Sequence, residues 1–185
     1  MNIFILNSDP IIAAQEQCDK HVVKMIVESG QMLSTAHRML DGIVERRPSK
    51  SGKTTVNYYK LPDEREDIMY KAVHFNHPCS IWSRESTENY KWHYRHFIAL
   101  CDEYTYRYGK VHSTDTKLRK PLRYPPDALI NMFSELTPFR LAMQSNPECM
   151  FEDAVKSYRA FYHTKQERFK MDWSKRPIPE WFNVI

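Results

Sequence analysis

The segment "HVVKMIVESGQMLST", residues 21–35, is apolar around most of a predicted helix but carries a line of polar side chains. At about 100° per residue, these side chains fall within an arc of about 80°, while Val22, Ile26 and Leu33 lie elsewhere on the circumference. This line, called the polar seam below, consists of His21, Lys24, Glu28, Gln31 and Thr35. Imidazole, amine and carboxylate groups on one helix face are typical of acid–base and nucleophilic catalysis.

The polar seam has two interpretations, and the sequence leaves both open. If it faces water, Lys24 and Glu28 form a pair that stabilises the helix by only about 0.2–0.5 kcal/mol and indicates no site. If it faces inward, an ionised carboxylate costs several kcal/mol unless it is well paired, so burial would indicate a functional site. Gly30 lies opposite the seam. Because glycine costs about 1 kcal/mol relative to alanine in a helix, we expect another element to pack closely there.

A second cluster of functional groups lies in "HFNHPCSIW", residues 74–82. Proline is typical of the first position of a helix, so Asn76 is expected to cap a helix that begins near Pro78. His77 is expected to point into a pocket, and Trp82 is a further candidate for substrate binding. The His-x-x-His-x-Cys spacing is compatible with zinc in principle, but no fourth ligand is apparent. We therefore expect neither a metal nor another cofactor.

Aromatic and basic residues alternate in "EYTYRYGKVH", residues 103–112. Arg107, Lys110 and His112 are candidates for substrate binding, because aromatic rings stack on bases and cations pair with phosphates. The tyrosines have a simpler alternative, as core residues whose hydroxyl groups reach the surface. The same two interpretations apply to the aromatic and basic C-terminal tail, residues 171–185.

The charge of the chain is mildly basic, with 27 Lys and Arg against 23 Asp and Glu and a net charge of +4. Cations are concentrated in residues 42–60 and 104–124, which suits a phosphate-rich partner such as DNA or a nucleotide, although solubility explains the excess equally well. The predicted contacts to a DNA backbone are Arg46, Arg47, Lys50, Lys53, Lys175 and Arg176.

The hydrophobic pattern predicts one all-α or nearly all-α domain over residues 1–185. Helices are expected over residues 10–40, 63–73, 80–108, 127–133 and 151–168, with a break near Cys18 and Asp19 in the first. A long buried helix carries the polar seam, and residues 42–60 form a mobile basic loop.

The chain has no apolar run of the roughly 20 residues that span a bilayer, and its N-terminus lacks the pattern of a signal peptide. We therefore expect a cytoplasmic protein without a membrane partner, in the host cytoplasm if a phage encodes it. The four scattered cysteines are expected to be free thiols. The sequence does not determine the oligomeric state.

The spacing of Asp19, His21 and Glu28 resembles the first helix of the pyrimidine-dimer DNA glycosylases, the endonuclease V family. Bacterial proteins grouped with this family carry the patterns [HR]-x2-K-x3-E-x2-Q-x-L and N-H-P-x2-3-W. The first matches the residues from His21 to Leu33, and the second those from Asn76 to Trp82. The ending with Arg176, Pro177, Trp181 and Phe182 is similar to the aromatic tail of the phage enzyme. The chain as a whole also resembles proteins of tailed phages.

This resemblance implies an endonuclease V-like helical fold, with Glu28 as the catalytic carboxylate and an amine as the nucleophile. The phage enzyme has a small residue after its initiator Met, which is removed, whereas Asn2 follows Met1 here. The nucleophile is therefore open between the amine of Met1 and Lys24, with His21 orienting Glu28 or binding phosphate.

Three functions follow as hypotheses. The first is a DNA glycosylase that cleaves the N-glycosidic bond of a damaged or modified base, with or without cleavage of the abasic site. The second is an enzyme or binder of a free nucleotide or nucleotide signal in the same pocket. The third is a DNA-binding module without catalysis, in which the polar seam is merely solvated.

Overall fold

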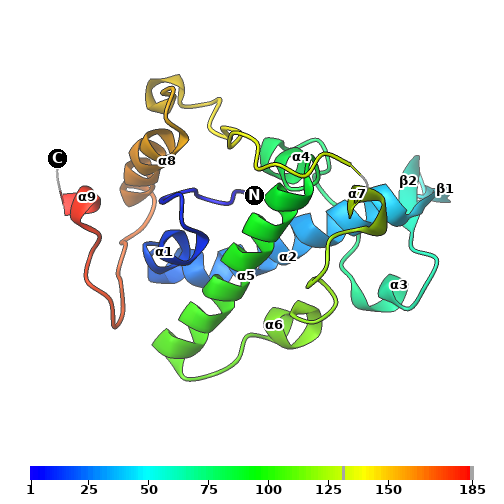
Figure 1. Cartoon of the computed structure of the whole chain (residues 1–185), viewed down its shortest axis with the longest axis horizontal. Coiled ribbons are helices and arrows are strands. Elements are labelled where there is room, and N and C mark those ends of the chain that lie inside the picture. Colours follow the sequence, from blue (N-terminus) through cyan, green and yellow to red (C-terminus); the bar gives the residue numbers. More distant parts are fainter. Residues whose placement is uncertain (131, 184–185) are drawn as a thin grey trace.

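Two long helices that cross each other form the centre of the fold (Figure 1). The computed structural model describes residues 1–130 and 132–183. Helix α2 spans Asp19–Asp41, and α5 spans Thr87–Tyr108. Apolar side chains of both helices, such as Leu33, are fully buried. The removal of this apolar surface from water is the main contribution that holds the crossing together.

Shorter helices surround this crossing, and side-chain caps define where several of them begin. α1 (Pro10–Gln15) packs beside α5, and the Asp9 carboxylate caps it by accepting hydrogen bonds from the backbone N–H groups of Ile11 and Ile12. Ser86 caps α5 in the same way. The other helices are α3 (Arg65–Ile68), α4 (Pro78–Trp82), α6 (Ser113–Leu118), α7 (Asp127–Ile130), α8 (Ala154–His163), α9 (Glu180–Asn183), and the 3-10 turns η1 (Pro147–Cys149) and η2 (Thr164–Glu167). Within the described residues, none of the helices has the length and apolar character needed to cross a membrane.

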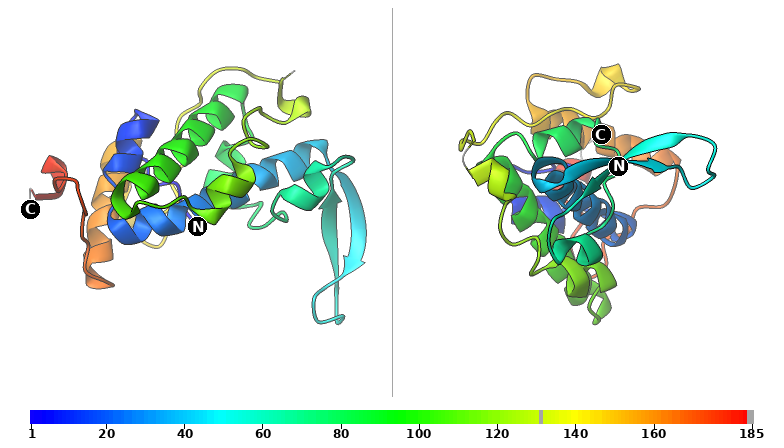
Figure 2. Two further views of the ribbon diagram at one scale, coloured as in Figure 1. Left: turned by 90° about the horizontal axis from the view of Figure 1, so that it is seen from below. Right: turned by 90° about the vertical axis from the view of Figure 1, so that its right-hand side faces the viewer.

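The prediction of an all-α, endonuclease V-like domain is wrong. Only about half of the chain is helical, and residues 42–60, for which a loop is predicted, contain an antiparallel β-hairpin. Its strands are β1 (Ile43–Pro48) and β2 (Thr55–Lys60), with Val44 opposite Tyr59. The β-branched and aromatic residues of both strands favour extended structure and outweigh the polar composition. The hairpin projects from the end of α2 away from the helices (Figure 2).

Most predicted helices exist, but several are shorter than expected. The break near Cys18 is confirmed, because α2 begins at Asp19. The segment predicted as a helix over residues 63–73 contains only α3, and the segment over residues 80–108 is divided into α4 and α5. Ser86 explains this division, since its side chain caps a new helix instead of continuing the old one.

The close packing expected at Gly30 is confirmed. A Cβ atom at this position would lie 3.0 Å from side-chain carbons of both Thr114 and Leu118, on α6. Such a distance is too short for a larger residue without movement of α6. Gly30 thus allows α6 to cover the face of α2 that lies opposite the polar seam.

Candidate active site

The polar seam of α2 opens onto a cavity of about 330 Å³. Its walls are the N-terminal segment, one face of α2, Ala142 and residues 161–169, while Gln31 and Thr35 of the seam lie outside it. Ile3 is buried and fixes the N-terminal segment beside the helix. Phe4 has a φ of 56°, in the left-handed region that non-glycine residues rarely adopt. Backbone strain of this kind is concentrated at functional sites.

The Glu28 carboxylate lies in the cavity wall and has three positively polarised neighbours. Its Oε2 accepts a hydrogen bond of 2.9 Å from the backbone N–H of Asn2 and lies 3.6 Å from the amine of Met1. Its Oε1 lies 3.3 Å from Nζ of Lys24. The Glu28 side chain is 12% exposed, so it is shielded from bulk water and yet borders the cavity. The carboxylate is therefore held in one position, facing any ligand that enters.

The cavity also contains basic and aromatic side chains that the sequence analysis does not identify. Lys165 and Arg168 line it, together with the rings of Phe161 and Phe169. All four follow one another closely in the C-terminal part of the chain, where no recognisable motif marks them. Cations and aromatic rings around one carboxylate suit a ligand that combines a phosphate with a flat base.

His21 belongs to the cavity wall as a neutral imidazole. Its Nδ1 lies 2.7 Å from the hydroxyl group of Tyr162, and its ring stacks on Phe4 with 4.6 Å between centroids. Burial, followed by the positive charges of Lys24 and Lys165, lowers the pKa of His21 to about 3. A neutral ring does not attract phosphate as a cation does, so His21 is placed to orient the cavity wall.

We expect His21 to remain neutral from about pH 5 to pH 8, because its folded-state pKa lies well below the ordinary value near 6.5. Imidazole NMR signals recorded along a pH titration measure this directly. The His21 signals should show no titration step in this range, whereas a midpoint near the ordinary value would contradict the buried, neutral assignment.

The Asn-His-Pro cluster lies next to the cavity but does not line it. His77, not Asn76, caps α4, because its Nδ1 accepts a hydrogen bond of 3.2 Å from the backbone N–H of Cys79. Burial first and the N-terminal amine second lower the pKa of His77, so this ring lies near Met1. Asn76 is exposed, and Trp82 is a core residue with 1% exposure. The position of Trp82 thus offers no surface to a substrate.

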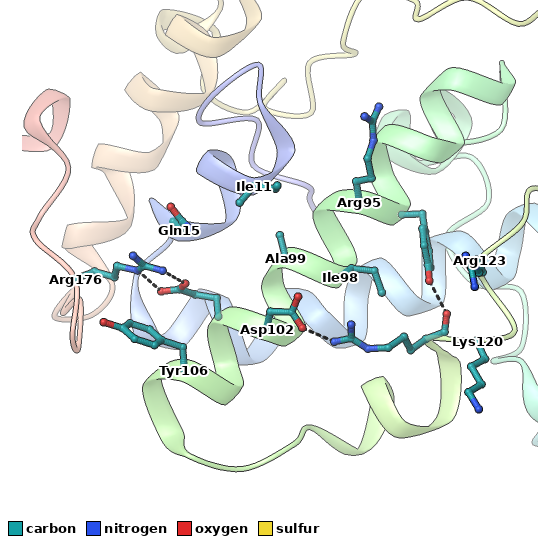
Figure 3. Close-up of a pocket in the computed structure, with 13 residues that line it drawn as sticks. Ile11, Gln15, Arg95, Ile98, Ala99, Asp102, Tyr106, Lys120, Arg123 and Arg176 are labelled. Atoms are coloured by element: carbon teal, nitrogen blue, oxygen red, sulfur yellow. Dashed lines mark hydrogen bonds and ion pairs between the residues drawn. The ribbon is translucent and has the colours of Figure 1, made fainter.

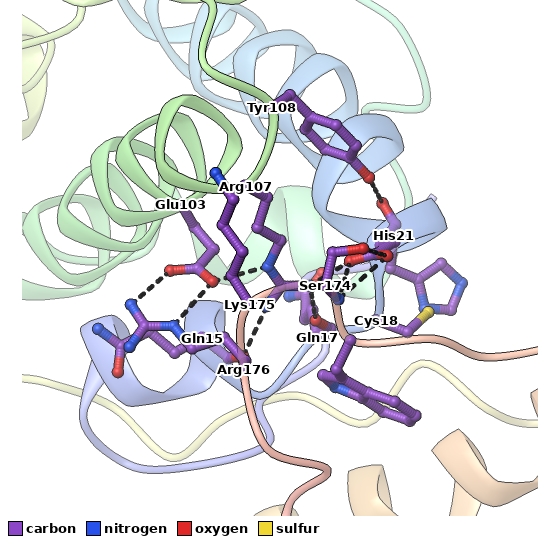
Figure 4. A network of polar contacts seen from close by, with 12 residues as sticks. Gln15, Gln17, Cys18, His21, Glu103, Arg107, Tyr108, Ser174, Lys175 and Arg176 are labelled. Atoms are coloured by element: carbon purple, nitrogen blue, oxygen red, sulfur yellow. Dashed lines mark hydrogen bonds and ion pairs between the residues drawn. The ribbon is translucent and has the colours of Figure 1, made fainter.

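Arg107 lies at the centre of a buried ionic network (Figure 4). Its side chain is fully buried and donates hydrogen bonds to the backbone carbonyls of Gln15 and Gln17 and to the carboxylates of Asp19 and Glu103. These bonds connect α5 to the junction between α1 and α2. Arg107 therefore holds the start of α2 in place and does not face the cavity.

The remaining candidates near α5 also lie outside the cavity. Lys110 is exposed, and His112 caps α6 through a hydrogen bond to a backbone N–H group. In the tail, Arg176 pairs with Glu103 at 2.9 Å, and Lys175 donates to a backbone carbonyl of α5. Both tail cations are thus used to attach the described part of the tail, residues 171–183, to α5.

The basic residues of the hairpin differ in how far they are already paired with other side chains. Arg47 pairs with Glu45 and lies over the ring of Tyr58 at 3.6 Å. Arg46, Lys50 and Lys53 are exposed. The two lysines flank the turn between the strands, and in the part of the chain that the structure describes they form no ion pair. They are the hairpin cations most available to a phosphate backbone.

A larger cavity, of about 690 Å³, lies over α1 and α5 (Figure 3). Its two acidic residues, Asp102 and Glu103, are paired with Arg119 and Arg176. Their partners are guanidinium groups, which do not give up a proton in proteins, whereas the partners of Glu28 are amines. We therefore assign the chemistry to the smaller cavity, where a carboxylate and several amines share one space.

Among residues 1–130 and 132–183, no group of three or more His, Cys, Asp or Glu side chains is arranged to hold a metal ion. Comparison of the chain with protein-family models, with curated proteins and with solved structures finds no match.

Proposed function

We propose that this protein cleaves the N-glycosidic bond of a damaged or modified nucleotide in DNA, with Glu28 as the catalytic carboxylate. The position of Glu28 carries the proposal, since it borders a cavity between the amines of Met1 and Lys24. Positive charge develops on the sugar as a base leaves, and a fixed carboxylate stabilises that charge. The resemblance of the polar seam to the pyrimidine-dimer DNA glycosylases supports the same reaction.

In the proposed reaction, the target nucleotide leaves the helical stack and its sugar enters the cavity, at a cost of a few kcal/mol. Stacking of the base on Phe161 or Phe169 offsets this cost. Arg168 pairs with an adjacent phosphate, and ionised Glu28 faces C1′ of the sugar. Water or an amine of the cavity then forms the new bond to C1′, and Glu28 takes up the released proton.

Base release from a panel of duplex oligonucleotides, each with one damaged or modified base, tests this function. We expect free base from at least one member of the panel and none from the unmodified duplex. Chromatography of the free bases measures the reaction. If every modified duplex stays as intact as the unmodified one, the proposal is wrong.

The hairpin supports DNA as the substrate because of its position. Gly42 directly follows α2 and lies 14 positions after Glu28, a distance of about 21 Å at 1.5 Å per residue. One turn of duplex DNA is longer, about 34 Å, so a duplex over the cavity can also contact the hairpin.

We expect the double substitution of Lys50 and Lys53 by Ala to weaken duplex binding roughly tenfold at low salt, and to reduce the slope of log affinity against log salt by about 2. Each phosphate contact releases about one counterion from the DNA, so a variant that lacks two contacts releases about two counterions fewer on binding. Fluorescence anisotropy at several salt concentrations measures both values. Lys91→Ala, on α5, serves as the control, and an unchanged slope in the double variant would exclude the hairpin from the interface.

A free nucleotide is the second candidate substrate. The volume of the cavity is compatible with a ligand of this size. About 330 Å³ lies at the lower end of the range for small-ligand pockets and suits one nucleotide unit. The salt dependence separates the two candidates. Steep salt dependence of duplex binding favours DNA, whereas salt-insensitive, weak duplex binding with saturable binding of a mononucleotide favours the free ligand.

A further inference from the structure

Lys165 is a lysine that is almost completely buried at the cavity. It lies in η2 and is 7% exposed. Across the described residues, 1–130 and 132–183, no carboxylate lies within ion-pair distance of its amine. Its contacts are the Thr164 hydroxyl, at 3.3 Å, and the ring of Phe161, whose centroid lies 3.3 Å from Nζ. An ammonium group has three donors, so this environment leaves most of its hydrogen-bonding capacity unused.

Removal from water makes the ammonium ion of Lys165 less favourable than that of an exposed lysine. Burial, followed by the positive charge of Arg168, lowers the pKa of Lys165 to about 8. An ordinary lysine has a pKa near 10.4 and is almost entirely protonated at neutral pH. Desolvated lysines with lowered pKa values are typical nucleophiles toward carbonyl carbons and related centres.

The other two amines of the cavity have different surroundings. The Met1 amine lies 3.6 Å from Glu28, and Lys24 lies 3.3 Å from the same carboxylate. The Lys24 side chain is also 64% exposed. Lys165 alone among the three combines burial, an aromatic contact and the absence of a paired carboxylate, and it lines the same cavity as Glu28.

We infer that Lys165 is the amine that attacks C1′ of the deoxyribose and forms a covalent imine between protein and DNA. This inference rests on the proposed function, because it names the nucleophile of that reaction. It assigns Glu28 to the transfer of protons between the amine and the sugar.

The lone pair of Lys165 Nζ forms a bond to C1′, and the electron pair of the bond between C1′ and the base leaves with the base, which takes a proton from water. The Glu28 carboxylate removes one proton from the new ammonium through a water molecule, because its oxygens lie beyond ion-pair distance of Nζ. The nitrogen lone pair then expels the ring oxygen O4′, which receives that proton from Glu28, and a C1′–N double bond results. Hydrolysis of this imine regenerates Lys165.

Borohydride trapping with a duplex that contains a preformed abasic site tests the inference without requiring base release. Borohydride reduces the imine to a stable amine, and peptide mapping by mass spectrometry then identifies the modified residue. We expect the adduct on Lys165. An adduct on Met1 or Lys24, or no adduct above a control without borohydride, would overturn the inference.

Lys165→Arg keeps the positive charge but removes the nucleophile, so we expect trapping to fall at least 50-fold. Lys170→Arg, which replaces an exposed lysine nearby, should leave trapping unchanged. The wild-type trapping rate should rise with pH to a midpoint near 8 and then level off, since only the neutral amine attacks. A rate that keeps rising toward the ordinary lysine pKa would contradict the assignment.

Base release measured in parallel separates the two proposals. Release of a base without an adduct on Lys165 rejects the role of Lys165 and leaves the glycosylase proposal intact. An adduct on Lys165 with abasic DNA, but no base release from any modified duplex, supports Lys165 as the nucleophile and rejects the glycosylase proposal.

Discussion

Glu28→Gln is expected to lower the rate of base release at least about 100-fold, within the range that a general acid or base contributes. Glutamine keeps an oxygen that accepts the hydrogen bond from Asn2 N–H, so the cavity wall should retain its shape. It loses the negative charge that stabilises the positively charged sugar and the site that accepts a proton. Single-turnover base release measures the effect directly.

The free energy of unfolding should fall by only about 1–3 kcal/mol in Glu28→Gln, because Lys24 is exposed and only the shielded Met1 amine loses a charged partner. Glu88→Gln removes an exposed carboxylate paired with Lys91 and serves as the control with full activity. A Glu28→Gln protein that releases base as fast as the wild type would remove Glu28 from the mechanism.

Arg107→Met is expected to lower the free energy of unfolding by about 3–5 kcal/mol, as found when one partner of a buried ionic network is removed. The substitution leaves two backbone carbonyls and part of the charge on Asp19 and Glu103 without a donor. Chemical denaturation monitored by circular dichroism measures the loss.

Lys110→Met provides the matched control, because Lys110 is exposed and its loss should change stability by less than about 0.5 kcal/mol. The structural role and the substrate-binding role of Arg107 predict opposite results for Arg107→Met. If Arg107→Met folds with wild-type stability but loses affinity for DNA or nucleotide, Arg107 is a substrate contact and its structural role is wrong.

The part of the site that lies on one helix could be predicted from the sequence. The period of the helix alone places His21, Lys24 and Glu28 on one face, and all three line the cavity. Lys165 and Arg168 could not be found in this way. They reach the cavity through the packing of the C-terminal segment against α2, and no local pattern encodes such a contact.

The positions of most helices could also be predicted from the sequence, but the β-hairpin could not. Asp9 followed by Pro10 predicts the start of α1, because both residues suit fixed positions at a helix N-terminus. The hairpin was missed since its charges and its serine- and glycine-containing turn suggest a loop, while its strand propensity comes from Val44, Val56 and their neighbours. Strand pairing depends on the register between two segments, here from Pro48 opposite Thr55 to Ile43 opposite Lys60, and composition alone does not reveal a register.

The central claim, that the Glu28 carboxylate faces the reacting sugar, is tested most directly by an affinity comparison between two duplexes. One carries a pyrrolidine ring in place of a deoxyribose, which is positively charged as the sugar is in the transition state, and the other carries a neutral tetrahydrofuran ring. Transition-state mimics bind more tightly than substrates, so we expect the wild type to prefer the pyrrolidine duplex by at least about tenfold and Glu28→Gln to lose this preference. Equal affinities of the wild type for both duplexes, or a preference that persists in Glu28→Gln, would contradict the claim.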